Sequence, residues 1–194
     1  MKIEQFVMAY GIEQDRIRTL LPDEYVSLRP VLRINTEIRD NKNVYVEFNT
    51  PVEAEGKRGW LNIAHWDSSK DDIRFERQDK TVTIQSDFLE LTYTGVGIEG
   101  GCPAEGDNEG CFFLGEEPWF RPNEKIENNK EFCDCQFKWK FSDSDASGVS
   151  VGKTLAAFLE EVTTVYEKQK LTAENAASIP CKQVLGTYIV RFER

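Results

Sequence analysis

The chain has 194 residues and a formal net charge of −10, because 34 acidic residues outnumber 24 lysines and arginines. Apolar residues make up 40% of it and charged residues 30%, which excludes a disordered or collagen-like chain. We expect one domain over residues 1–194, since a chain of this length can bury a sufficient core without a metal or a disulfide. The negative net charge disfavours nucleic acid and anionic membrane surfaces as partners.

The expected location is the cytoplasm. No stretch approaches the ~20 apolar residues that a membrane-spanning helix needs, and the opening segment MKIEQFVMAYGIEQ carries acids where a secretory signal is apolar. The five cysteines are an odd number and no asparagine lies in an N-x-Ser/Thr sequon. We therefore expect free thiols.

Strict alternation in residues 31–39 predicts a strand with one apolar and one polar face. Residues 44–49 alternate in the same way after the turn at 40–43, so the two segments predict a hairpin. The apolar face of the first strand carries Leu32, Ile34, Thr36 and Ile38, and the polar face carries Arg33, Asn35, Glu37 and Arg39.

The rest of the chain predicts more strands and two helices. A short helix is expected at 15–21, where Pro22 ends it, and a long amphipathic helix at 151–171, whose apolar stripe would pack on the sheet. Further strands are expected at 60–66, 81–85, 88–94, 132–141 and 183–193. The fold class is β-rich α+β, with a mainly antiparallel sheet that is open, a sandwich or a barrel.

Two groups of residues resemble cofactor or metal sites without matching them. Gly95 to Gly100 has the spacing of a dinucleotide fingerprint, but Pro103 and further glycines follow, so we expect a glycine-rich loop to Gly110 rather than a phosphate-binding helix. The second group lacks the paired C-x2-C spacing of a zinc site. Its members are Cys102, Cys111, Cys133 and Cys135, of which the last two lie on the apolar face of a predicted strand. We expect neither a cofactor nor a metal.

The candidate ligand-binding residues are Arg33, Asn35, Glu47 and His65. Arg33 and Asn35 share the polar strand face with Glu37 and Arg39, and Glu47 lies on the hairpin partner. On an open sheet this face is solvated, whereas in a closed sheet it lines a cavity where charge pairing and pKa values are tuned. His65, the only histidine, is expected on the strand face of Leu61 and Ile63, as a core or rim residue or as a general acid or base.

The order of segments in residues 12–66 resembles the N-terminal half of the acetoacetate decarboxylase-like family. The segments that carry the resemblance are Ile17-Arg18-Thr19-Leu20-Leu21-Pro22, Arg29-Pro30-Val31-Leu32-Arg33-Ile34, Val44-Tyr45-Val46-Glu47 and Gly59-Trp60-Leu61-Asn62-Ile63-Ala64. The resemblance implies a sheet closed into a barrel or cone around a small-molecule site. It also implies that Glu47 matches a strand acid of the family, whereas Asn35 replaces another.

The family's decarboxylase forms a Schiff base on a lysine whose pKa a second lysine lowers. This chain has no Lys-Lys pair, and Lys70, at the corresponding place, is followed by Asp71 and Asp72. The expected function is therefore binding of a small organic acid without Schiff-base chemistry, with Arg33 pairing the acid and Glu47 as the candidate catalytic or hydrogen-bonding residue. Two alternatives stay open. One is a lyase or decarboxylase acting on a keto acid. The other is a protein-interaction module, whose contact surface would be an aromatic patch formed by Phe112, Phe113, Trp119 and Phe120. The partner in that case could be a second copy of the chain, which would form a homo-oligomer.

Overall fold

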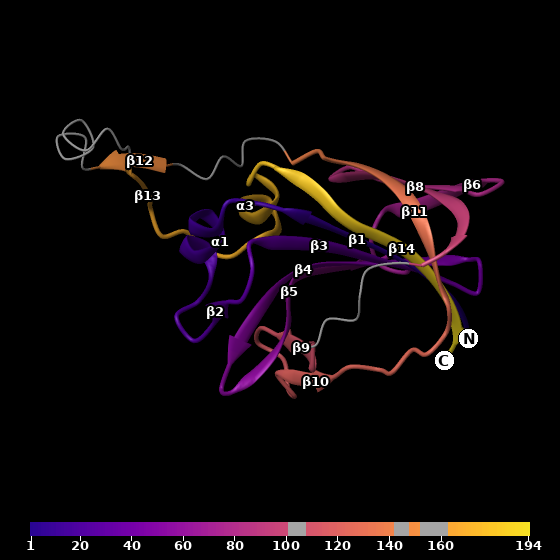
Figure 1. Cartoon of the computed structure of the whole chain (residues 1–194), viewed down its shortest axis with the longest axis horizontal. Helices are drawn as coiled ribbons and strands as arrows, with labels where there is room; N and C mark the ends of the chain where they lie inside the picture. Colours follow the sequence, from indigo (N-terminus) through magenta and orange to yellow (C-terminus); the bar gives the residue numbers. More distant parts are fainter. Residues whose placement is uncertain (101–107, 142–147, 152–162) are drawn as a thin grey trace.

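The computed structural model describes residues 1–100, 108–141, 148–151 and 163–194. In this part of the chain twelve strands form one sheet (Figure 1). They are β1 (Lys2–Gly11), β2 (Val26–Ser27), β3 (Val31–Arg39), β4 (Asn43–Ala54), β5 (Lys57–Asp67), β6 (Ile73–Gln78), β7 (Thr81–Ser86), β8 (Leu89–Glu99), β9 (Gly110–Phe113), β10 (Phe120–Pro122), β11 (Lys130–Trp139) and β14 (Gln183–Glu193). The neighbours run in the order β10-β9-β5-β4-β3-β1-β14-β11-β8-β7-β6, with β2 paired to β4.

The predicted hairpin is confirmed, because β3 and β4 pair antiparallel with Asn35 opposite Glu47. Each of the other predicted strands overlaps an observed strand, although the one at 88–94 begins a residue before β8 and the one at 132–141 extends two residues past β11. All neighbouring pairs along the sheet are antiparallel except β5 and β9, which run parallel. A central strand that was not predicted, β1, pairs with β3 on one side and β14 on the other.

Two short helices occur in the described part of the chain, α1 (Gln14–Leu20) and α3 (Ala173–Ala177). The first confirms the helix predicted before Pro22. The second is capped by Thr172, whose hydroxyl accepts a hydrogen bond from the backbone N–H of Asn175 at 3.1 Å. Among the described residues, no helix has both the length and the apolar character needed to span a membrane.

The long helix predicted at 151–171 is wrong. Residues 163–166 form strand β13 (Thr163–Tyr166), which pairs with β12 (Gly148–Val151) in a separate two-stranded sheet. Residues 152–162 lie outside the described part of the chain. The segment Thr163-Thr164-Val165-Tyr166 consists of β-branched and aromatic residues, which favour strands, so its apolar spacing did not discriminate between the two structures.

The prediction of a sheet closed into a barrel or cone is also wrong. The sheet is open, with β10 and β6 at its two edges. It curls instead, so that β4 and β6 contact each other and the apolar face encloses its own core. Alternation of apolar and polar residues is the same in a curled sheet and in a closed barrel, and therefore could not decide closure.

Aromatic side chains from distant strands fill the inside of the curl. Trp139 on β11 lies 4.5 Å from Phe48 on β4, measured between ring centroids, and its Nε1 donates a hydrogen bond to the Tyr10 hydroxyl at 3.1 Å. Trp66 on β5 stacks on Phe88 at 4.4 Å. These contacts hold the two halves of the sheet against each other.

We expect Trp139→Ala to lower the free energy of unfolding by about 3 kcal/mol. The substitution leaves a cavity among aromatic rings and removes the hydrogen bond that Trp139 donates to the Tyr10 hydroxyl. Phe132→Ala is the matched control on the same strand. Phe132 is 45% exposed, so its loss should cost about 0.5 kcal/mol or less. Urea unfolding followed by circular dichroism measures both values, and equal costs would contradict the role assigned to Trp139.

Candidate functional site

A cavity of about 600 Å³ lies against the polar face of the sheet. Its floor is built by β1, β3, β4 and β14, and its other wall comes from β9 and from residues 121–130, which we call the cover. Figure 1 shows the cover running from β10 to β11. The lining residues are Gln5, Val7, Ala9, Arg33, Asn35, Glu37, Glu47, Asn108, Cys111, Phe113, Arg121, Pro122, Asn123, Glu124, Lys125, Ile126, Lys130, Gly186, Tyr188, Val190 and Arg194.

The alternation of β3 directs its polar residues into this cavity. Arg33, Asn35 and Glu37 line the floor, while Ile34 and Ile38 point to the other face and belong to the hydrophobic core. The sheet is thus buried on both sides at β3, although it does not close. The predicted residues Arg33, Asn35 and Glu47 are brought together here.

Glu37 is 4% exposed and fully engaged in ion pairs. One carboxylate oxygen accepts from Arg39 Nε at 2.9 Å, and the other lies 3.2 Å from Arg194 Nη2. Arg194 also pairs with Glu124 of the cover at 2.7 Å, so it ties the cover to the floor. Glu37 therefore has a structural role at this end of the cavity.

Among the described residues, Glu47 has only neutral partners. Its Oε1 accepts a hydrogen bond from the Tyr45 hydroxyl at 2.9 Å and its Oε2 accepts one from Asn35 Nδ2 at 3.4 Å. Burial, and then the neighbouring Glu47 carboxylate, raise the pKa of Tyr45 above its ordinary value, so Tyr45 stays protonated and donates. In the described part of the chain, no lysine or arginine forms an ion pair with Glu47.

Arg33 is likewise without an acidic partner among the described residues. Its guanidinium carbon lies 3.7 Å from the centroid of the Trp60 ring, and its Nη2 donates to the Asn49 side chain at 3.4 Å. Its Nε is buried without a hydrogen-bond partner. The cavity floor therefore presents an unpaired cation as well as an unpaired anion.

Cys111 adds a thiol to the wall opposite Arg33. Burial raises the pKa of Cys111, although the Arg33 charge acts against this effect. The thiol is therefore protonated at neutral pH and is a weak nucleophile.

None of the described cysteines forms a disulfide. Cys133 is buried and Cys135 packs on the core, which confirms them as core residues, and Cys102 lies outside the described residues. In the described part of the chain, no three His, Cys, Asp or Glu side chains gather closely enough to hold a metal ion.

His65 does not lie where the alternation predicted. A bulge in β5 leaves Ile63 without a partner on β4, so the pattern shifts by one residue and His65 pairs with Glu47 in register. His65 is exposed, its ring centroid is 5.9 Å from that of Tyr45, and it does not line the cavity.

Other expected features lie outside the cavity or change their structure. The glycine-rich loop expected from Gly95 begins as strand, since β8 continues to Glu99, and residues 101–107 are outside the described part. Lys70 is exposed in the turn after β5 and does not line the cavity.

The expected aromatic patch is not exposed as a whole. Phe112 and Phe113 are buried, and Trp119 and Phe120 pack against Phe112 at 5.2 and 4.9 Å between ring centroids.

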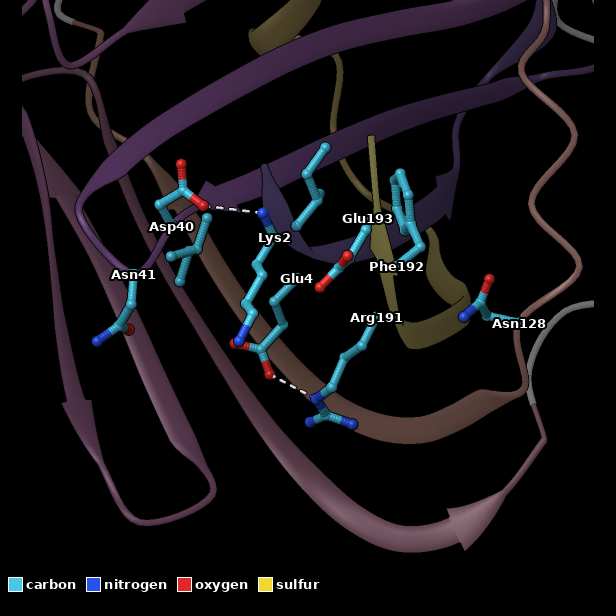
Figure 2. A pocket seen from close by; sticks show the side chains of 10 residues that line it. Lys2, Glu4, Asp40, Asn41, Asn128, Arg191, Phe192 and Glu193 are labelled. Atoms are coloured by element: carbon cyan, nitrogen blue, oxygen red, sulfur yellow. Dashed lines mark hydrogen bonds and ion pairs between the residues drawn. The ribbon is translucent and has the colours of Figure 1, made fainter.

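A second hollow of about 590 Å³ lies where the first residues of β1 meet the last residues of β14 (Figure 2). Its arginine, Arg191, is already paired with Glu4 at 2.9 Å and with Glu131 at 2.8 Å. The Lys2 amide donates to Asp40 at 2.8 Å. The unpaired charges of the first cavity make it the stronger candidate.

Sequence reasoning missed the residues that distant segments bring to the cavity. Arg121, Lys130 and Arg194 come from the cover and from the end of β14, and nothing in their local sequence marks them. The roles of the Asn35 amide and the Cys111 thiol depend on side chains from other strands, which the local sequence does not reveal.

We expect the two cavity glutamates to differ in their effect on stability. Glu37→Gln should lower the free energy of unfolding by about 2–3 kcal/mol, because it leaves the partly buried Arg39 and Arg194 with one charge fewer. Glu47→Gln should cost less than about 1 kcal/mol, since an amide keeps an acceptor for Tyr45 and no ion pair is broken. Urea unfolding measures both, and the reverse order would contradict these roles.

The fold is similar to those of solved enzymes. A structure of acetoacetate decarboxylase aligns with 98% of this chain and 84% of its own, with a TM-score of 0.53 and 12% identity. The enduracididine biosynthesis enzyme MppR complexed with pyruvate aligns over 98% and 84%, with a TM-score of 0.55 and 10% identity. An acetoacetate decarboxylase-like enzyme from Sphingomonas wittichii RW1 aligns over 98% and 88%, with a TM-score of 0.50 and 9% identity.

No protein-family model matches the chain, and no curated protein matches its sequence. The similarity therefore concerns the arrangement of the backbone. It agrees with the resemblance noted in residues 12–66 and extends it to nearly the whole chain. The chain has the fold of the acetoacetate decarboxylase-like enzymes.

Proposed function

We propose that the protein binds a small organic acid in the cavity beneath the cover and does not perform Schiff-base chemistry on it. The carboxylate of the ligand pairs with Arg33, and Glu47 hydrogen-bonds another polar group of the same molecule. The volume of about 600 Å³ is of the size found for small-molecule sites.

The observation that carries this proposal is the state of Arg33. A guanidinium in a cavity wall is costly to bury without a counterion. Among the described residues, Arg33 pairs with no carboxylate, and its side-chain partners are the Trp60 ring and the Asn49 side-chain oxygen. An anionic ligand would supply the missing counterion through charge-assisted hydrogen bonds.

The similar fold of MppR, whose structure contains pyruvate, supports a small acid as the ligand class. The position of Lys70 supports the lack of Schiff-base chemistry at this residue, because it is exposed and does not line the cavity.

A lyase or decarboxylase acting on a keto acid is the alternative. It is favoured by Lys125 and Lys130, which line the same cavity from the cover. The ammonium of Lys130 lies 4.5 Å from the centroid of the Tyr188 ring. In such an enzyme Glu47 would act as the acid or base.

The proposal predicts that pyruvate, lactate or a longer monocarboxylate of up to six carbons raises the melting temperature. Arg33→Met should weaken binding about 10- to 100-fold, because it keeps the side-chain stem on Trp60 but removes the charged donors. Arg29→Met is the matched control. Arg29 also approaches Trp60, at 5.9 Å, but does not line the cavity, so its variant should bind like the wild type.

Calorimetry and thermal shift measurements decide this prediction. Unchanged affinity in Arg33→Met would overturn the assigned role of Arg33. The absence of binding by every acid in the series would overturn the proposed function.

Borohydride trapping separates binding from lyase chemistry. An imine between a lysine and pyruvate or acetoacetate is reduced by borohydride to a stable amine, which intact-mass spectrometry detects. We expect no added mass. Labelling that disappears in Lys130→Met or Lys125→Met would instead establish the lyase alternative.

A further inference from the structure

The geometry of the cavity floor points to a zwitterionic ligand, and we propose that the bound acid is a small α-amino acid. This inference rests on the proposed function, since it accepts Arg33 as the partner of the carboxylate. It adds a partner for the protonated amine at the neighbouring Glu47.

The first step is the charge pattern. Arg33 and Glu47 both line the cavity, and neither has an ion pair among the described residues. In contrast, Glu37 in the same floor is neutralised by two arginines. In the floor itself, one cation and one anion therefore have no ion-pair partner among the described residues, while Lys125 and Lys130 line the cavity from the cover.

The second step is the spacing of these two residues. Arg33 lies opposite Asn49 in the antiparallel pair, and Asn35 lies opposite Glu47, so Arg33 and Glu47 are diagonal neighbours. The backbones of diagonal neighbours are about 7–8 Å apart, and their side chains lie on the same face of the sheet. Arg33 and Glu47 both line the cavity on that face, so one small molecule can contact both of them. An α-amino acid, whose two charged groups are one carbon apart, can form a hydrogen bond of about 2.9 Å at each end.

The third step is the orientation of Asn35. This residue is 8% exposed and lines the cavity, and its Nδ2 faces the Glu47 carboxylate at 3.4 Å. The reverse orientation of the amide would place two acceptors against each other. Its Oδ1 consequently points away from Glu47 and is buried without a partner.

Together these groups offer acceptors suited to an ammonium group. Glu47 uses two of its roughly four acceptor positions for Tyr45 and Asn35, and Asn35 Oδ1 is a further acceptor. An ammonium brings three donors and a compensating charge, a hydroxyl brings one donor and no charge, and a ketone brings none. The site should therefore rank amino acids above hydroxy acids and hydroxy acids above keto acids.

The test compares acids of the same shape that differ only in the group next to the carboxylate. One series is pyruvate, lactate and alanine, and the other is 4-methyl-2-oxopentanoate, 2-hydroxy-4-methylpentanoate and leucine, with both enantiomers of each chiral probe. Affinities for the full chain are measured by calorimetry. We expect the amino acid of at least one series to bind about tenfold or more tightly than its keto acid.

Glu47→Gln shows whether this preference arises at Glu47. It removes the charge but keeps an acceptor, so it should weaken binding of the amino acid until its affinity is no higher than that of the keto acid. Glu53→Gln is the control, because Glu53 lies on the same strand, pairs with Arg58 and is outside the cavity. It should retain the preference.

The outcomes separate the two proposals. Keto acids that bind as tightly as amino acids, or a preference that persists in Glu47→Gln, overturn the zwitterion inference and leave the proposed function standing. If no probe of either series binds, both are overturned.

Discussion

The structure depends on burying both faces of strand β3. Its apolar side supplies Leu32, Ile34 and Ile38 to the core, and its polar side forms the floor of the cavity. In an open sheet one face is normally left to water. Here the curl of the sheet encloses the first face, while β9 and the cover, residues 121–130, enclose the second. Polar side chains on β3 are thus removed from bulk water. A charged side chain among them is costly to bury unless an ion pair, hydrogen bonds or a bound ligand compensate its charge.

The charges of the floor meet this requirement in two ways. Glu37 is surrounded by Arg39 and Arg194, and through Glu124 the same network holds the cover in place. Arg33 and Glu47 are compensated by dipoles and an aromatic ring instead. Leaving two opposite charges apart costs stability that a direct ion pair would recover in part. Departures of this kind from good local pairing are expected at functional sites, where a ligand completes the interactions.

Local patterns in the sequence were sufficient for the parts of the fold that depend on neighbours along the chain. The hairpin of β3 and β4 follows from alternation and a turn, and with it the grouping of Arg33, Asn35 and Glu47. Features that depend on distant contacts were missed. The open, curled form of the sheet involves contacts between distant strands, such as that of Trp139 with Phe48, and the position of His65 depends on a single bulge at Ile63. The segment 163–166 had an apolar spacing compatible with helix and strand alike, and its β-branched residues form a strand.

The similarity to acetoacetate decarboxylase concerns the backbone, and the side chains of the cavity show why function cannot be transferred with it. A Schiff-base enzyme needs an amine whose pKa is lowered inside the site, whereas Lys70 is exposed outside it. Lys125 and Lys130 line the same cavity from the cover, but among the described residues neither forms an ion pair with Glu47. The Glu47 carboxylate is instead held by hydrogen bonds from the neutral groups of Tyr45 and Asn35. Under the proposal made above, a ligand that carries its own amine supplies the cation that this carboxylate lacks.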